Sequence, residues 1–468
     1  MLSPVDTVVR KLVPLAFVVA LFWSLIPLAR TPASAHQLRV LGYSFKGHMN
    51  TVQDGGILGP LAKAPTNADC QAEGHIHCYS PQELRKAYGL TSAIDSGITG
   101  KGETIALIES FGSPTALEDL KKFDKDYGLP DPPSFEQIAP LGSVPFDPKT
   151  HGFIGWALET SLDVQWAHAM APGANIVVMT SPVAQTQGTQ GLPEFLQLEK
   201  YAIQHHYKIF SQSWAATENT LFTPEGKKVL NDFDTFYKQA VQEDDATFFS
   251  AAGDSGSANV DEKGHTYPFP TVNFPASSPW ATAVGGTSLS TDADGNYQSE
   301  KVWNQGVGAA GGGGISQYFK TPEYQNANLP KSVLETLKGY RGIPDVSADA
   351  DPDTGLPIYM GFLDTDKDSP GNGYYVFGGS SGSTPIWAGF LADAFQYAGH
   401  PIKQLNSKLY QLAQDKDAYA HVFHDVTVGD NAQSPIPGYQ ATEGWDLATG
   451  WGSPIADKLF DYLASVDK

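Results

Sequence analysis

The stretch Phe377-Gly378-Gly379-Ser380-Ser381-Gly382-Ser383-Thr384-Pro385-Ile386-Trp387 sets a serine between a glycine-rich turn and an apolar run that continues to Ala398. Glycine lets the backbone turn tightly, and the start of a helix offers unpaired N–H groups and positive potential. Proline is tolerated in a first helical turn, so the run predicts a helix beside an exposed, nucleophilic hydroxyl. Taken alone, the pattern is more typical of a loop followed by an N-capped helix.

Composition narrows the class of protein. The 468 residues can hold one large α/β domain or about two or three smaller ones. The net charge is −21, so we expect no nucleic-acid binding, because few cations are available to neutralise phosphates. A surplus of carboxyl groups suits a protein that works in acid, where many are neutral and self-repulsion falls.

The N-terminus has the pattern of a secretory signal. Two basic residues precede an apolar run at 12–29, and Ala33-Ser34-Ala35 supplies a cleavage site. We therefore interpret residues 1–35 as a signal peptide and expect a secreted, extracellular protein without stable membrane association after cleavage. The alternative is a retained anchor, although the run is short for a membrane span.

The next segment, residues 36–68, is interpreted as a short irregular leader, and the folded domain is expected over residues 69–468. Cys70 and Cys78 are the two cysteines of the chain. In an exported protein they most simply form a disulfide. Two histidines between them leave a metal site as the alternative, but the spacing matches no common zinc pattern.

Beyond Tyr79 the chain alternates strand-like and helix-like runs. The strand candidates are Thr104–Glu109, Asn175–Thr180, Lys208–Trp214, Thr247–Ala252 and Trp280–Val284. The helix candidates are Pro114–Tyr127, Gly155–Ala169, Leu192–His205, Lys227–Glu243 and Thr384–Ala398. This alternation predicts an α/β fold with a mostly parallel sheet, in which sites form at the carboxyl ends of strands.

Glu159 and Asp163 stand four residues apart within a helix candidate. This spacing sets both carboxyl groups on one helical face, where like charges repel. If the two groups are held close, one keeps a proton, and the pair can supply a general base and a group that orients it. The alternative is a solvated acidic face.

Two further motifs end strand candidates. Asp254 lies in Gly253-Asp254-Ser255-Gly256, a glycine-flanked turn after a strand, although ordinary turns have the same composition. Ser211-Gln212-Ser213-Trp214 ends another strand, and plain strand packing explains it equally well.

The order of these motifs is specific. Glu-x-x-x-Asp at 159–163 precedes Ala-Ala-Gly-Asp-Ser-Gly at 251–256 and Gly-Gly-Ser-Ser-Gly-Ser-Thr-Pro at 378–385. This set resembles the sedolisins, acid-acting serine-carboxyl peptidases with a subtilisin-like fold. The resemblance extends from Cys70 to the C-terminus and includes Phe274–Pro279, Ala283–Ser288 and Ile343–Ala348. It implies a three-layer α/β fold with a mostly parallel central sheet flanked by helices.

The resemblance also implies site residues. Those that match are Ser381 as nucleophile, Glu159 as general base, Asp163 as its orienting group and Asp254 in the oxyanion hole. Glu109 and Trp214 match residues that extend the acid network in some members. An aspartate donates a hydrogen bond only when protonated. Since free carboxyl groups titrate at about pH 4, we expect the best activity at roughly pH 3–5.

The expected function is therefore that of an acid-acting serine endopeptidase that cleaves proteins or peptides as a monomer. Ionised Glu159 would take the proton of Ser381 as the hydroxyl attacks a peptide carbonyl, and protonated Asp254 would stabilise the oxyanion. A tripeptidyl-peptidase of the same family is the alternative. Asn273 lies near the S1 pocket in the family and argues against a basic P1 side chain, which a carboxylate would favour.

A calcium site is expected near the C-terminus. Aspartates and backbone carbonyls on glycine-rich turns suit a hard cation, although two unrelated turns would look alike. Sedolisins bind calcium at this place, which implies one structural Ca²⁺ ion that pins the C-terminal loops. By position, its ligands would be the carboxylates of Asp425 and Asp446 and the carbonyls of Val426, Thr442 and Gly444.

The sequence departs from the family in two respects, and three alternative functions are left open. Ser380 stands where the family has Thr, and the family's large folded pro-domain is expected to be missing, because only the short leader precedes Cys70. A neutral subtilisin-type protease would need a histidine base, which His151 offers. A catalytically inactive, calcium-stabilised binding protein and a surface-anchored structural protein are the non-enzyme alternatives.

Overall fold

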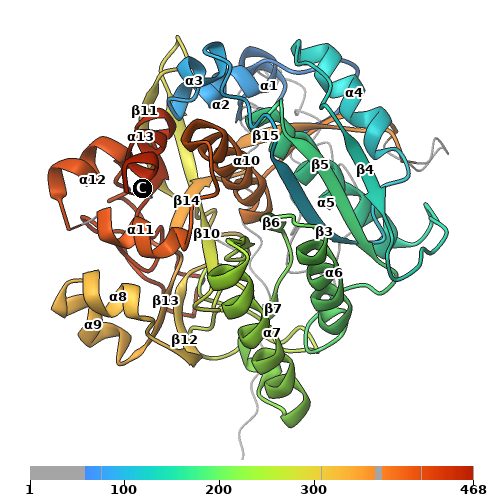
Figure 1. Ribbon diagram of the computed structural model, residues 1–468. Coiled ribbons are helices and arrows are strands. Elements are labelled where there is room, and N and C mark those ends of the chain that lie inside the picture. Colours follow the sequence, from blue (N-terminus) through green and yellow to red (C-terminus); the bar gives the residue numbers. More distant parts are fainter. Residues whose placement is uncertain (1–57, 75, 307, 364–370, 413, 467–468) are drawn as a thin grey trace, which may run out of the picture. The chain divides into compact units, whose positions relative to one another are not determined.

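The computed structural model describes residues 58–74, 76–306, 308–363, 371–412 and 414–466 (Figure 1). The predicted signal peptide and most of the predicted leader lie outside these residues. Within the described part, no helix combines the length and apolar character needed to cross a membrane.

The largest sheet has eight strands in the order β11-β10-β8-β6-β3-β5-β4, and β14 pairs with β10 outside this path. Its pairings are parallel except for the antiparallel pair β10–β11. The strands are β3 (Thr104–Ser110), β4 (Phe135–Ile138), β5 (Asn175–Ser181), β6 (Ile209–Gln212), β8 (Thr247–Ala251), β10 (Ala281–Thr291), β11 (Tyr297–Val302) and β14 (Val346–Asp349). The predicted α/β fold with a mostly parallel sheet is confirmed.

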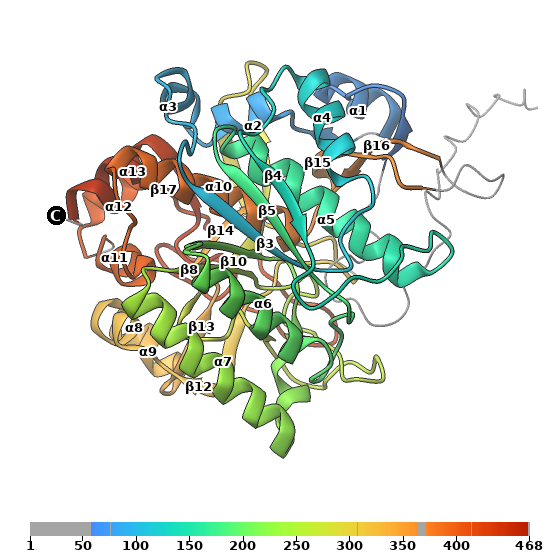
Figure 2. The same ribbon diagram turned by 45° about the vertical axis from the view of Figure 1, so that its right-hand side comes forward.

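Helices cover both faces of this sheet (Figure 2). The largest are α4 (Ala116–Tyr127), α5 (His151–Met170), α6 (Leu192–Gln204), α7 (Pro224–Glu243) and α10 (Ser380–Ala398). Ile105 and Leu107 of β3 pack in the apolar cluster that contains α5 and α10, whereas Ala106 and Ile108 pack with α6 and α7. Successive strand residues point to opposite faces, so a strand covered on both faces is apolar throughout.

A smaller sheet has the order β1-β16-β15-β2. Its strands are β1 (Leu58–Leu61), β2 (His77–Cys78), β15 (Thr354–Met360) and β16 (Gly373–Phe377). The segment 36–68 was expected to be irregular, but β1 pairs antiparallel with β16 and its Leu58 is buried against Ile76 and Val376. This apolar packing explains why β1 forms. Strand β1 in turn supports β16, the strand that leads directly to Gly378.

The remaining elements are short, apart from the C-terminal helix. They are α1 (Asn67–Gly74), α2 (Pro81–Ala87), α3 (Thr91–Asp95), β7 (Ala216–Thr217), η1 (Glu218–Leu221), β9 (Asn273–Phe274), β12 (Gly314–Lys320), α8 (Glu323–Asn328), α9 (Lys331–Leu337), β13 (Tyr340–Ile343), α11 (Leu405–Leu412), α12 (Lys416–Val422), β17 (Phe423–His424), β18 (Ser453–Pro454) and α13 (Ala456–Val466). Cys70 and Cys78 form the predicted disulfide, which leaves neither thiolate for the alternative metal site.

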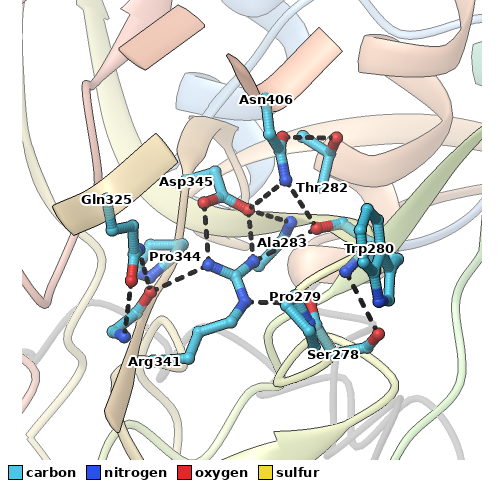
Figure 3. Close-up of polar contacts among 12 residues, drawn as sticks. Ser278, Pro279, Trp280, Thr282, Ala283, Gln325, Arg341, Pro344, Asp345 and Asn406 are labelled. Atoms are coloured by element: carbon cyan, nitrogen blue, oxygen red, sulfur yellow. Dashed lines mark hydrogen bonds and ion pairs between the residues drawn. The ribbon is translucent and has the colours of Figure 1, made fainter. Parts of the chain in front are cut away.

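A buried ion pair fixes the start of β10 (Figure 3). Arg341 and Asp345 are fully buried and share two hydrogen bonds, of 3.1 and 2.6 Å. The guanidinium also donates to the carbonyls of Ser278 and Ala281, while Asp345 accepts from the Ala283 N–H. A buried charge is tolerated when its partners satisfy it, so this cluster assigns a packing role to the Ile343–Ala348 signature.

Candidate active site

The helix that carries Ser381 begins earlier than the sequence predicts. Helix α10 starts at Ser380 instead of Thr384, directly after Gly379, whose φ of 110° is in the region that glycine adopts without strain. Ser381 is therefore in the first helical turn. Its side chain is fully buried, in contrast to the exposed hydroxyl that the glycine-rich turn suggests.

Pro385 within α10 explains an unusual contact of the nucleophile candidate. Proline has no N–H, so the Ser381 carbonyl, four residues earlier, receives no helical hydrogen bond. The Ser213 hydroxyl oxygen lies 3.1 Å from this carbonyl oxygen and 2.9 Å from Asp163 Oδ1. A hydroxyl carries one proton, so Ser213 links the acid and the nucleophile but donates to one of them at a time.

Glu159 and Asp163 are fully buried on α5, which packs against α10. The alternative of a solvated acidic face is therefore wrong. Burial and the charge of Asp163 raise the pKa of Glu159 well above its ordinary value, while the nearby Ser381 hydroxyl opposes the shift. Both carboxyl oxygens of Glu159 are buried. The carboxyl thus faces the nucleophile candidate as a general base would.

Glu109, at the end of β3, joins the same cluster. Burial raises the pKa of Asp163, and its hydrogen bond from Ser213 and the nearby Glu109 carboxyl group oppose the shift. Burial and the charges of Asp163 and Glu159 likewise raise the pKa of Glu109. Trp214 differs from expectation, because its indole N–H has no hydrogen-bond partner among the described residues and its ring packs 4.6 Å from that of Phe195.

Asp254 lies on the turn that follows β8 and contacts the start of α10. Its Oδ1 accepts hydrogen bonds from the backbone N–H and the hydroxyl of Ser380, both at 2.8 Å. Burial raises the pKa of Asp254 to about 7, although both hydrogen bonds oppose the shift. A carboxyl group with this pKa keeps its proton in mild acid and can then act as a donor.

The alternative base, His151, begins α5, eight residues before Glu159. Eight residues correspond to about 12 Å along a helix, so the backbone of His151 is two turns away from the carboxyl that contacts Ser381. The side chain of this helix that lies near Ser381 is therefore a carboxyl group.

Comparison with known proteins agrees with this geometry. The model of the subtilase family, Peptidase_S8, matches residues 151–452. Kumamolisin from Bacillus sp. (strain MN-32) is 33% identical over 90% of this chain and 74% of its own length. The chain belongs to the sedolisin family of subtilases, the serine-carboxyl peptidases.

Further relatives extend the comparison. Sedolisin from Pseudomonas sp. (strain 101) is 29% identical over 87% of this chain, which spans 64% of that protein. The solved structure of Pseudomonas sedolisin, complexed with two molecules of pseudo-iodotyrostatin, matches with a TM-score of 0.70 at 27% identity and covers 84% of this chain and 100% of that one. Tripeptidyl-peptidase 1 of Rattus norvegicus is 27% identical over 92% of this chain and 74% of its own length.

Asn273, the specificity candidate of this sedolisin relative, is fully buried in β9. Its amide nitrogen donates to the carbonyl of Ala252 at 3.0 Å and to Asn259 Oδ1 at 3.1 Å. Its own Oδ1 has no partner among the described residues. Asn273 is therefore anchored beside the turn that carries Asp254, and its Oδ1 is a neutral hydrogen-bond acceptor that none of the described residues uses.

The calcium candidates of this sedolisin-family chain come together at the C-terminal loops. Asp425, after β17, accepts a hydrogen bond from the Gly444 N–H at 2.9 Å, and Asp446 accepts one from the Thr442 N–H at 2.8 Å. Burial raises the pKa of Asp425, and that of Asp446 to about 6. Val426 is also buried in this region.

These loops fit a hard cation. Asp425 Oδ1 is buried and has no hydrogen-bond partner in the described part of the chain. The described residues contain no group of three or more His, Cys, Asp or Glu side chains suited to a metal, so carbonyl oxygens would have to complete the ligand set of a cation here. Oxygen ligands of this kind are those that Ca²⁺ prefers.

Sequence reasoning did not identify the parts of Ser213 and Ser380. For the segment Ser211–Trp214, strand packing is an alternative that the sequence leaves open, and Ser380 stands out in the sequence only as a departure from the family. Both hydroxyls contact the acidic groups of the site through hydrogen bonds between segments far apart in the chain. The signal that could have found Ser213 is Pro385, which removes a helical donor and so requires another.

Proposed function

We propose that the protein is an acid-acting serine-carboxyl endopeptidase with Ser381 as nucleophile. The single observation that carries this proposal is the convergence of α5, α10 and the turn after β8. It sets buried Glu159 against Ser381 and buried Asp254 against the neighbouring Ser380. Family membership supports the reaction class.

The mechanism follows from these contacts. Ionised Glu159 accepts the proton of Ser381 as the hydroxyl attacks the peptide carbonyl, and Asp163 orients Glu159. Protonated Asp254 and the Ser381 N–H stabilise the oxyanion. Glu159 then gives its proton to the leaving amine, and water releases the acyl group from Ser381.

The pH range follows from the same groups. Asp254 must hold its proton, so activity is lost as pH rises through its pKa of about 7. Glu159 must be ionised, so activity is lost as pH falls through its pKa, which burial raises. Both limits lie above those of free carboxyl groups, and the expected window therefore shifts from pH 3–5 toward neutrality.

We further propose a structural calcium ion. Its ligands would be the carboxylates of Asp425 and Asp446 and the carbonyls of Val426, Thr442 and Gly444. A bound Ca²⁺ would supply positive charge that neutralises the two carboxylates, and it would tie the loop after β17 to the loop 442–446. Its role is to stabilise these loops, since the residues proposed for the reaction are separate from them.

The proposed setting is extracellular. The signal pattern at 1–35 and the Cys70–Cys78 disulfide both suit export, because disulfides persist in oxidising compartments. Substrates would be proteins or peptides, and neither nucleic acid nor a membrane is an expected partner of the mature protein, which we propose acts as a monomer. The domain proposed for catalysis covers residues 69–468, together with the strand β1.

Hydrolysis of a denatured protein between pH 2 and pH 8 tests the function. Wild type should cleave best on the acid side of neutrality, and Ser381→Ala should abolish cleavage. Glu159→Gln, which keeps the shape but not the base, should lower kcat by a factor of about 10²–10⁴. Activity that persists in Ser381→Ala, or that peaks near pH 8, would contradict the proposal.

A second candidate is a tripeptidyl-peptidase, which the likeness to tripeptidyl-peptidase 1 favours. Mass spectrometry of the products separates the two. A peptide with an acetylated N-terminus should be cleaved internally by an endopeptidase. Release of tripeptides from the same peptide only when its amine is unblocked would favour the second candidate instead.

A further inference from the structure

Two turns of the proposed active site are joined by hydrogen bonds in both directions. The Gly253 N–H donates to Ser380 Oγ at 3.0 Å. The Ser380 N–H and hydroxyl each donate to Asp254 Oδ1 at 2.8 Å. Ser380 and Asp254 are only 1% and 3% exposed, so water does not readily replace these partners.

The direction of each bond is determined by chemistry. A backbone N–H can only donate, so Ser380 Oγ must accept from Gly253. The single proton of the Ser380 hydroxyl is then left for Asp254 Oδ1. The neighbouring hydroxyls of Ser383 and Thr384 donate to the Ser380 carbonyl and do not compete for Asp254 Oδ1.

Asp254 Oδ1 therefore faces two hydrogen-bond donors, which affects which oxygen carries the proton when Asp254 is protonated. A proton on Oδ1 would point at two donor hydrogens, whereas a proton on Oδ2 leaves Oδ1 as the acceptor that both require. We propose that Ser380 is a positioning residue that keeps the proton of Asp254 on Oδ2, the oxygen that remains to donate to the substrate carbonyl. This inference rests on the oxyanion role proposed above for Asp254.

The same hydroxyl also affects the pH range. Both hydrogen bonds from Ser380 favour the ionised form of Asp254 and lower its pKa, against the larger effect of burial. Loss of the hydroxyl should therefore raise the pKa of Asp254. The alkaline limit of activity should move to higher pH, while the proton of Asp254 is held less firmly on Oδ2. A purely structural residue would not produce this combination.

Ser380→Ala in the full-length protein tests the proposal, and Ser383→Ala is the matched control. Ser383 lies in the first turn of the same helix and is also fully buried, but its hydroxyl lies 3.0 Å from the Gly285 carbonyl and 2.9 Å from the Ser380 carbonyl and makes no hydrogen bond with Asp254. In Ser380→Ala, kcat should fall about tenfold, less than for loss of an oxyanion donor itself, and the alkaline limit should rise. Ser383→Ala should leave that limit unchanged, and Ser380→Thr, which keeps the hydroxyl, should restore both kcat and the limit.

An unchanged alkaline limit in Ser380→Ala would overturn the inference, whether or not kcat falls. Near-ultraviolet circular dichroism checks that the variant is folded. If it is not, Ser380→Cys retains a side chain with only a weak donor, and its alkaline limit must likewise lie above that of wild type. Failure of the proposed function is distinguishable, because cleavage would then survive in Ser381→Ala.

Discussion

Replacement of Asp254 by asparagine should uncouple activity from acidity. In wild type the donor is a carboxylic acid, which exists only below the pKa of the group, about 7. An amide donates at every pH. The two donors of Ser380 would hold the amide oxygen where Oδ1 lies now, so the NH₂ group would occupy the place of Oδ2.

The size of the effect can be calculated from this pKa. At pH 9, two units above it, about 1% of wild-type molecules keep the proton on Asp254, and kcat should fall to about 1% of its maximum. The Asp254→Asn variant has no proton to lose at this position. Its kcat at pH 9, relative to its own maximum, should therefore be about 100-fold higher than that of wild type.

The assay is a pH–kcat profile with a saturating peptide substrate, and Asp254→Ala serves as the control that lacks a donor. The acid limit should be similar in wild type and Asp254→Asn, because Glu159 sets it. An alkaline limit that stays near pH 7 in Asp254→Asn would refute the reasoning. It would assign that limit to the coupled pair of Glu159 and Asp163.

Two further predictions concern stability. Burial raises the pKa of Asp393, whose two carboxyl oxygens have no hydrogen-bond partner among the described residues. The contribution of Asp393 to stability is complete below the unfolded pKa of about 3.9, and it is lost as pH rises through the higher pKa of the folded protein. Asp393→Asn should therefore reduce the fall in Tm between pH 4 and pH 8. An unchanged fall in Tm would contradict this. Removal of Ca²⁺ with EGTA should lower the free energy of unfolding by about 2.7 kcal/mol relative to protein at 100 times the Kd. Asp446→Asn should abolish the response to the chelator, and a wild-type Tm that EGTA does not change would exclude the ion.

The strands of the sheet were predictable because burial on both faces leaves a clear local signal. The predicted strand Thr104–Glu109 ends within one residue of β3, and its uninterrupted apolar run reflects two covered faces. Element boundaries near the site were less predictable. Helix α10 begins at Ser380, directly after Gly379, whose positive φ allows the turn there, and its first residues are buried.

The acidic residues of the site were also only partly predictable from the sequence. The spacing of Glu159 and Asp163 placed them on one helical face but left open whether that face is solvated. Burial of both against α10 decided the question. Trp214 was expected to join the acid network, yet it packs in the apolar cluster of α6 and α7.

The sequence by itself determined the α/β class, the disulfide and the order of the candidate acids and serine, because composition, periodicity and motif spacing are local properties of the chain. Tertiary structure alone decided that Ser213 lies between Asp163 and the Ser381 carbonyl, and that Ser380 donates twice to Asp254. These contacts join segments separated by 50 to 168 residues, and burial shifts the pKa values of the carboxyl groups. Neither proximity across the fold nor desolvation can be read from a local pattern, since both depend on how the elements pack.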